Sequence, residues 1–289
     1  MHLAYLACQV TLPGSPNRRV DAFEHDQMMD CLRPAFEAHG DKVTDVSWDD
    51  ADVDWSQFDA ALIGTTWDYQ NNLPAFLKAL EAIEAHIPVF NSRALIGWNT
   101  DKRYLRDLGD KGARLIPTIW MDQVTPEAIT AAFDTFDADT LIAKRQVGAG
   151  AEGQHKLTRG EPVPPMPHAM MVQPFMPSIL AEGELSFIFI GGEFSHALLK
   201  TAADGDYRIQ SCYGGMETPI EPSEDDIAAA KSVLAACDET PLYARIDMVR
   251  ADDGGLVLME MELVEPFLYP LQGPELGPRL HAALKARLS

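Results

Sequence analysis

The N-terminal third of the chain alternates between strand-like and helix-like segments, and this alternation constrains the fold more than any other feature. Apolar residues recur at helical spacing over 22–38, where Pro34 is an expected kink or break, and over 73–85. Strands that alternate with helices form a small parallel sheet that is covered on both faces. We therefore expect a Rossmann-like parallel-sheet domain over residues 1–93. Its strands are predicted by apolar runs at 3–10, 42–47, 59–64 and 88–90.

The rest of the chain has a different pattern, with more strands than helices after residue 169. Four prolines in residues 161–168 exclude a helix there, and Gly191-Gly192 favours a tight hairpin turn. We therefore expect two α+β units, over 94–172 and 173–289. Helices are predicted at 99–109, at 125–133, at 225–237 after an N-cap at Ser223, and at the C-terminus. Strands are predicted at 117–121, 141–145, 154–157, 170–175, 184–190, 193–199, 243–249 and 256–262.

The charge of the chain excludes some classes of partner. Lys and Arg number 23 against 44 Asp and Glu, which gives a net charge of −21. Such a surface repels a phosphate backbone, so we expect no nucleic-acid partner. No apolar run approaches the ~20 residues of a membrane span. The four cysteines contain no C-x-x-C pair, which indicates reduced thiols and a cytoplasmic protein.

A glycine-rich stretch at 148–153 matches the pattern G-x-G-x-x-G through Gly148, Gly150 and Gly153. A dinucleotide site would require a helix after this stretch, but a short strand and a proline-rich turn follow instead. What remains is a hairpin loop whose backbone N–H groups could cover phosphate oxygens, with Lys144 supplying a positive charge. A surface hairpin without a ligand is the alternative.

Three carboxylates near the C-terminus are expected on one face of a hairpin. Glu260 and Glu262 are two residues apart in a predicted strand, so they point the same way, and the turn at 252–255 can bring Asp247 opposite them. Arg245 points in the same direction as Asp247. Converging carboxylates repel one another unless cations are bound, and hard oxygen ligands favour Mg²⁺. The alternative is a solvated acidic face, which the apolar neighbours in the strand disfavour.

This hairpin resembles the metal-binding hairpin of the ATP-grasp ligases, of the glutathione synthetase and D-alanine–D-alanine ligase type. The resemblance implies the ATP-grasp fold, with two α+β subdomains that clasp ATP beside the N-terminal domain. It implies metal ligation by Asp247, Glu260 and Glu262, a γ-phosphate role for Arg208 and an oxyanion role for Arg245. The positions that match the family's ATP-binding residues are Lys102, Lys144, Gly148, Gly150, Gly153, Gln173, Phe175, Met176 and Glu184.

The segments 64–80 and 98–109 are similar to the D-cycloserine synthetase type, a branch of cyclising ligases. Two positions depart from the wider family. Glu262 stands in place of the usual Asn, which adds negative charge, and Ser186 stands where glutathione synthetases carry an arginine. The second departure argues against glutathione as product. An arginine expected near Gly64 in cycloserine-type sequences is missing, so the substrate is left open.

The resemblance implies an enzyme that uses ATP and two Mg²⁺ ions, with Mn²⁺ as an alternative, to join a carboxylate to an amine through an acyl phosphate. The substrate would be a small amino-acid-like molecule, and the reaction could be intramolecular. An intermolecular amide- or peptide-forming ligase and a non-catalytic nucleotide-binding protein are the alternatives, and a homodimer is left open. Candidate substrate contacts are Thr66, Trp67, Asp68, Tyr69, Gly214 and Gly215.

Overall fold

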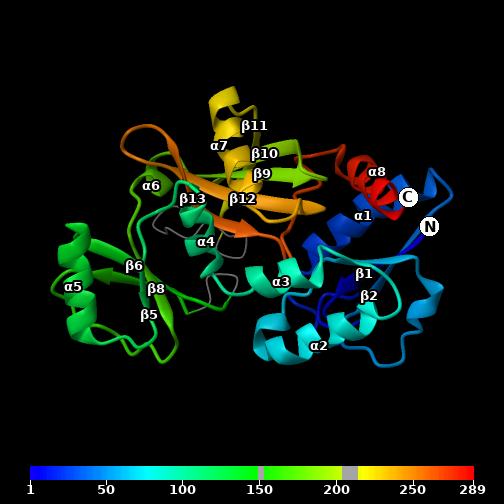
Figure 1. The fold of residues 1–289 in the computed structure, drawn as a ribbon, viewed down its shortest axis with the longest axis horizontal. Coiled ribbons are helices and arrows are strands. Elements are labelled where there is room, and N and C mark those ends of the chain that lie inside the picture. The colour runs from blue at the N-terminus through cyan, green and yellow to red at the C-terminus, as the bar shows by residue number, and fades with distance from the viewer. Residues whose placement is uncertain (149–152, 204–213) are drawn as a thin grey trace.

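The computed structural model describes residues 1–148, 153–203 and 214–289, whose strands form three sheets (Figure 1). The first sheet, in the order β2-β1-β3-β4, is parallel, as predicted. Its strands are β1 (His2–Ala7), β2 (Lys42–Ser47), β3 (Ala60–Ile63) and β4 (Val89–Phe90). Helices cover both faces of this sheet. Strands buried in this way are expected to be rich in apolar residues, as β1 and β3 are.

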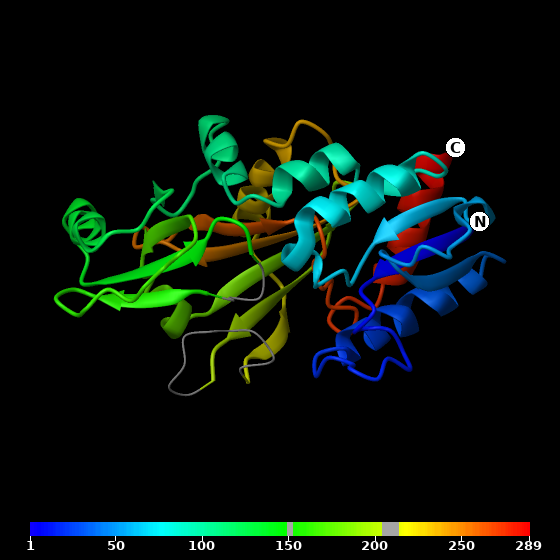
Figure 2. The ribbon, with the colours of Figure 1, turned by 90° about the horizontal axis from the view of Figure 1, so that it is seen from below.

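The other two sheets are antiparallel. The second has the order β5-β8-β6-β7 and the third the order β11-β10-β9-β12-β13. Figures 1 and 2 place the third sheet between the other two. The strands of the second sheet are β5 (Ile119–Met121), β6 (Thr140–Arg145), β7 (His155–Thr158) and β8 (Met170–Pro174). Those of the third are β9 (Glu184–Ile190), β10 (Glu193–Thr201), β11 (Met216–Ile220), β12 (Tyr243–Arg250) and β13 (Leu256–Glu262).

The helices agree with the predicted periodicity in most places. The longer ones are α1 (Phe23–Glu37), α2 (Leu73–Glu84), α5 (Pro126–Phe136), α7 (Glu224–Ala235) and α8 (Leu276–Leu288), and the short ones are η1 (Trp55–Gln57), η2 (Tyr69–Asn72) and α6 (Ser178–Ala181). Ser223 caps α7 as predicted, because its side chain accepts a hydrogen bond from Asp226 N at 3.1 Å. α1 continues through Pro34 without a break. Of the described helices, none is both long enough and apolar enough to cross a bilayer.

The single helix predicted over 99–109 is wrong, because the chain forms two helices there. α3 (Arg93–Asn99) ends before a turn, and α4 (Tyr104–Asp110) begins after it. In this turn the Asp101 side chain accepts a hydrogen bond from Arg103 N at 2.9 Å, which competes with helical hydrogen bonding. The backbone N–H of Lys102 donates to Gln146 O at 2.8 Å. The break therefore carries Lys102 to the end of β6.

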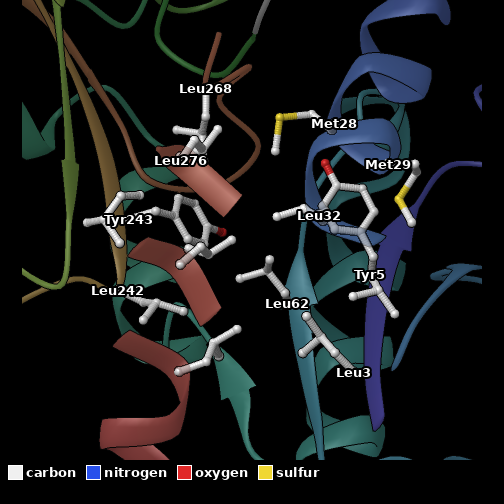
Figure 3. Packing of buried hydrophobic residues seen from close by; sticks show 14 of the residues in the cluster. Leu3, Tyr5, Met28, Met29, Leu32, Leu62, Leu242, Tyr243, Leu268 and Leu276 are labelled. Atoms are coloured by element: carbon white, nitrogen blue, oxygen red, sulfur yellow. The ribbon is translucent and has the colours of Figure 1, made fainter. Parts of the chain in front are cut away.

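The C-terminal helix α8 packs beside α1 of the N-terminal unit (Figure 1). Figure 3 shows apolar side chains of the first unit facing those of the last third of the chain, and together they form one buried cluster. The labelled members are Leu3, Tyr5, Met28, Met29, Leu32 and Leu62 on one side and Leu242, Tyr243, Leu268 and Leu276 on the other. This contact fixes the parallel sheet against the third sheet, and the loops between them line the site described next.

Candidate active site

A cavity of about 370 Å³ is lined by residues of the second and third sheets and by residues of the N-terminal unit that lie outside its strands. β6 and β8 supply one wall, the third sheet supplies the floor, and loops of the N-terminal unit supply the far wall. The sequence predicted that residues distant in the chain would converge at one site, and most of the candidate residues line this cavity. They are Trp67, Tyr69, Lys102, Lys144, Gly148, Gln173, Phe175, Met176, Glu184, Arg245, Asp247, Glu260 and Glu262.

The β12–β13 hairpin brings the predicted carboxylates together on the cavity floor. In its register, Asp247 is paired with Glu260 and Arg245 with Glu262. A bulge follows Asp247, so that the register shifts before Met248. The alternation of side chains then places Arg245 and Asp247 on the same face as Glu260 and Glu262, as the sequence predicted.

Each of the three predicted carboxylates of the hairpin is paired with a cation. Lys102 donates to Glu260, and Arg245 donates to Glu262 and, through Nε at 3.0 Å, to Asp247 Oδ2. Burial opposes ionisation of Asp247, but Arg245 and Lys200 outweigh it and lower its pKa to about 2. Burial also opposes ionisation of Glu260, and here Lys102 and Lys144 lower the pKa.

The donor set of the floor fits Mg²⁺ in chemistry, since it offers several carboxylate oxygens on one face. Within the described part of the chain, no three acidic, His or Cys side chains are already arranged around a point that could hold a metal ion. Lys102 and Arg245 supply the countercharge of these carboxylates. A bound cation would replace these contacts.

The residues matched to ATP binding line the wall formed by β6 and β8. Lys144 lies on β6, and burial lowers its pKa although Glu260 counteracts this effect. Gln173 is buried on β8 and donates through Nε2 to Thr118 Oγ1 at 2.9 Å. Phe175 and Met176 follow at the end of the strand and line the same wall. The apolar side chains of Phe175 and Met176 suit contact with a planar heterocycle.

Two predicted residues, Gly150 and Arg208, lie outside the described residues. Of the two described glycines of the loop, Gly148 lines the cavity and Gly153 does not. Gly153 has φ of 69°, and a Cβ there would lie 2.7 Å from Arg145 Cδ. This position therefore requires glycine for conformation and for space. Gly214 and Gly215 do not line the cavity.

The N-terminal wall contains two of the four candidate substrate residues that follow β3. Trp67 and Tyr69 line the cavity, and Trp67 Nε1 donates to the backbone oxygen of Glu265 at 3.1 Å. The other two point elsewhere. Thr66 is fully buried, and its hydroxyl has no hydrogen-bond partner among the described residues. Asp68 accepts a hydrogen bond from Trp48 Nε1 at 2.8 Å.

Several cavity residues were missed by the sequence reasoning, namely Lys200, Glu217, Glu265 and Tyr269. Lys200 is the cross-strand partner of Glu184, and its Nζ lies 3.0 Å from Glu184 Oε1. A register counted outward from the predicted turn at Gly191-Gly192 would have paired Glu184 with Leu199, because the bulge between Phe194 and His196, which brings Lys200 opposite Glu184, is not visible in the sequence. Glu265 could have been noticed as an isolated carboxylate among apolar residues directly before a proline.

Comparisons with known proteins support the resemblance. Residues 3–91 match the family model of the N-terminal domain of D-cycloserine synthetase DcsG. The chain is 29% identical over 265 residues to the cycloserine biosynthesis protein DcsG of Streptomyces lavendulae, an alignment that covers 83% of this chain and 87% of the relative.

Solved structures agree over the whole length. The crystal structure of D-cycloserine synthetase DcsG superposes with a TM-score of 0.84 at 25% identity and covers 100% of both chains. The D-alanine–D-alanine ligase of Bacillus anthracis has the same fold, with a TM-score of 0.66 at 14% identity over 100% of this chain and 97% of that one. The expected fold class is thereby confirmed.

Proposed function

We propose that the chain is an ATP-grasp ligase that forms carbon–nitrogen bonds, and that it closes a ring within a small amino-acid-like substrate. ATP and Mg²⁺ are the expected cofactors, since structures of the same fold have been solved with ATP and with Mg and ADP. The observation that carries the proposal is the convergence of Lys102, Lys144 and Arg245 on a single cavity beside the β12–β13 carboxylates.

The chemistry follows from the poor reactivity of a carboxylate, whose negative charge repels a nucleophile. Transfer of the γ-phosphoryl group from ATP to the carboxylate gives an acyl phosphate, and attack by an amine then forms the amide and releases phosphate. The protein contributes positioning and charge neutralisation. In this proposal Lys102 and Lys144 bind the α- and β-phosphates, and Arg245 stabilises the oxyanion that develops as the amine attacks.

Asp247, Glu260 and Glu262 would hold two Mg²⁺ ions, with Mn²⁺ as an alternative. When bound, the ions would neutralise the phosphate charge. The extra carboxylate of Glu262 is compatible with this role because Arg245, its present partner, offsets the added charge. Lys102 would then release Glu260 and bind the phosphates of ATP.

The remaining roles rest on the family resemblance. Arg208 is proposed to bind the transferred phosphoryl group, and the loop with Gly148, Gly150 and Gly153 to close over the phosphates and exclude water. Gln173, Phe175 and Met176 would contact adenine, and Glu184 the ribose side. The division into three units, residues 1–93, 94–172 and 173–289, is part of the proposal. A cytoplasmic location and a homodimer are further expectations that can be tested.

Substrate selection is assigned to the N-terminal unit, because Trp67 and Tyr69 line the cavity opposite the nucleotide wall. This wall is supported by Arg19, whose guanidinium carbon lies 5.6 Å from the centroid of the Trp67 ring. Similarity to D-cycloserine synthetase favours cyclisation over condensation of two molecules.

The experiment that tests the proposal is a screen for Mg²⁺-dependent ADP release with amino acids that carry a side-chain amine, including both enantiomers of diaminobutyrate. We expect ADP release with at least one compound, and mass spectrometry should show a product equal to that compound minus one water. A product equal to two substrate molecules minus one water would indicate an intermolecular ligase. ADP release without any new organic product, or none with any compound, would contradict the proposal.

A further inference from the structure

Glu265 belongs to a segment whose backbone is fixed from several directions. It follows β13 and precedes Pro266, which restricts its own backbone to extended conformations. Four carbonyl oxygens of this segment accept hydrogen bonds from side chains of other elements. They are Leu263 O from Asn91 at 2.9 Å, Val264 O from Tyr243 at 2.8 Å, Glu265 O from Trp67 at 3.1 Å, and Phe267 O from Arg245 at 3.2 Å. The position of Glu265 is therefore determined before any ligand binds.

The side chain of Glu265 differs from those of Asp247, Glu260 and Glu262, the carboxylates of the β12–β13 hairpin. It lines the cavity with only 9% of the residue exposed. No hydrogen bond or ion pair from residues 1–148, 153–203 or 214–289 reaches its carboxylate. By contrast, the carboxylates that are paired with a lysine or arginine are Glu184, Asp247, Glu260 and Glu262.

A buried carboxylate without a partner is costly, because desolvation is not compensated by a hydrogen bond. Burial and the nearby Glu262 raise the pKa of Glu265 well above its usual range, while Lys102 counteracts them only in part. The fixed backbone prevents the side chain from escaping this environment. Such an arrangement is expected at functional sites, where the missing partner is a ligand.

The charges of the reactants indicate which ligand this is. ATP and the substrate carboxylate are anions, and Glu260 and Glu262 already make this region acidic. Of the three groups that react, the γ-phosphate, the substrate carboxylate and the amine, only the amine carries N–H groups from which a carboxylate can accept a hydrogen bond at neutral pH. The Glu265 backbone is also bonded to Trp67, so the carboxylate lies between the wall assigned to the substrate and the floor assigned to the phosphates.

We propose that Glu265 binds the nucleophilic amine of the substrate and accepts its proton during amide formation. This rests on the proposed ligase function. In the step, the amine nitrogen forms a bond to the carbonyl carbon of the acyl phosphate, and the bond from that carbon to the phosphate oxygen breaks. Phosphate leaves with the bonding pair, and one N–H proton passes to the Glu265 carboxylate.

Two measurements on the Glu265→Gln variant need no substrate. The thermal midpoint of the ligand-free protein should stay the same or rise, because the neutral amide avoids the cost of burying an unpaired carboxylate. The matched variant Glu184→Gln should have a lower midpoint, because Lys200 loses a partner. The stabilisation by Mg·ATP should be unchanged in Glu265→Gln. A lower midpoint of the ligand-free variant would indicate that Glu265 has a structural role. A loss of the stabilisation by Mg·ATP would indicate that Glu265 binds metal. Either result would overturn the inference.

The third measurement separates the two chemical steps, with the compound found in the ADP screen and with hydroxylamine as a competing nucleophile. Hydroxylamine is nucleophilic in its neutral form and depends less on a base. Glu265→Gln should therefore still release ADP and form the hydroxamate, while formation of the amide falls by about 100-fold or more. A parallel fall of hydroxamate and amide would overturn the inference. If the wild type releases no ADP with any compound, the proposed function is wrong. That outcome differs from a failure of the inference about Glu265, in which the wild type is active and the variant loses hydroxamate and amide together.

Discussion

Lys200 lies directly across the strand pair from Glu184, with Nζ 3.0 Å from Oε1, and both side chains are almost completely buried. The same ammonium lies 3.3 Å from Asp247 Oδ1. Burial raises the pKa of Glu184 to about 7 even though Lys200 opposes the shift. Lys200 therefore links Glu184, which is assigned to the ribose side, with Asp247, which is assigned to the metals. Replacing Lys200 should change the stability of the protein.

We expect Lys200→Met to reduce the free energy of unfolding by about 3–5 kcal/mol, since it leaves Glu184 buried without a cation. Asp247 keeps Arg245 and should contribute less to the loss. The double variant Lys200→Met/Glu184→Leu should be more stable than Lys200→Met alone. Urea unfolding measures all three proteins. A double variant that is less stable than the lysine variant would show that Glu184 does not depend on Lys200.

A second prediction concerns pH and the N-terminal unit, away from the cavity floor. His25, whose ring nitrogen lies 3.2 Å from Asp45 Oδ2, lowers the pKa of Asp45 below the unfolded value of 3.8, although burial opposes this. A lowered pKa contributes stability above the unfolded value, and this contribution is lost as the pH falls through the folded value. Between about pH 4 and pH 2, the wild type should thus lose more stability than Asp45→Asn, as followed by thermal midpoints. Equal losses would contradict the assignment.

A third prediction concerns Trp67, which donates a hydrogen bond to Glu265 O from the N-terminal wall. Trp67→Phe should cost about 1 kcal/mol of stability and reduce amide formation, while stabilisation by Mg·ATP is unchanged. The control is Trp48→Phe, which removes an indole hydrogen bond to the Asp68 carboxylate, outside the cavity lining. Its stability loss should be at least as large, because the acceptor is a carboxylate, but its rate of amide formation should equal that of the wild type. Equal rates in both variants would remove Trp67 from substrate selection.

A fourth prediction concerns the metal ligands and needs only ATP. At about 100 times its dissociation constant, a ligand that binds only the folded state stabilises by about 2.7 kcal/mol. Glu260→Ala should lose the Mg²⁺-dependent part of this stabilisation, whereas Glu262→Asn should keep most of it, because an amide oxygen remains and repulsion falls. Lys144→Ala should weaken ATP binding with and without Mg²⁺. Thermal shifts that are unaffected by Glu260→Ala would mean that these carboxylates do not bind metal.

The sequence predicted the parts of the fold that depend on local patterns. The strand–helix alternation indicated the parallel sheet, and the spacing of Asp247, Glu260 and Glu262 indicated a shared face. Local patterns could not predict the break at Asp101, because it depends on a side chain that competes with the helix and on a contact with Gln146. Nor could they predict that α8 completes the core beside α1, since that contact joins the two ends of the chain.

The candidate site shows the same division. Strand periodicity and the family resemblance indicated the residues on the third sheet and the ATP wall, and these do line one cavity. Residues 65–69 follow a strand as an irregular loop, where no periodicity indicates direction, so Thr66 and Asp68 were grouped with Trp67 although they do not line the cavity. Lys200 and Glu265 required knowledge of register and of hydrogen bonds between distant segments.

The central claim is that a carboxylate is activated as an acyl phosphate, and isotope transfer tests it most directly. The substrate found in the ADP screen would be labelled with ¹⁸O in its carboxylate and turned over with Mg·ATP, and the released phosphate would be analysed by mass spectrometry. We predict one ¹⁸O atom in each phosphate, because the oxygen that accepts the phosphoryl group leaves with it. Amide formation with unlabelled phosphate, or with AMP and labelled AMP oxygen, would contradict the account.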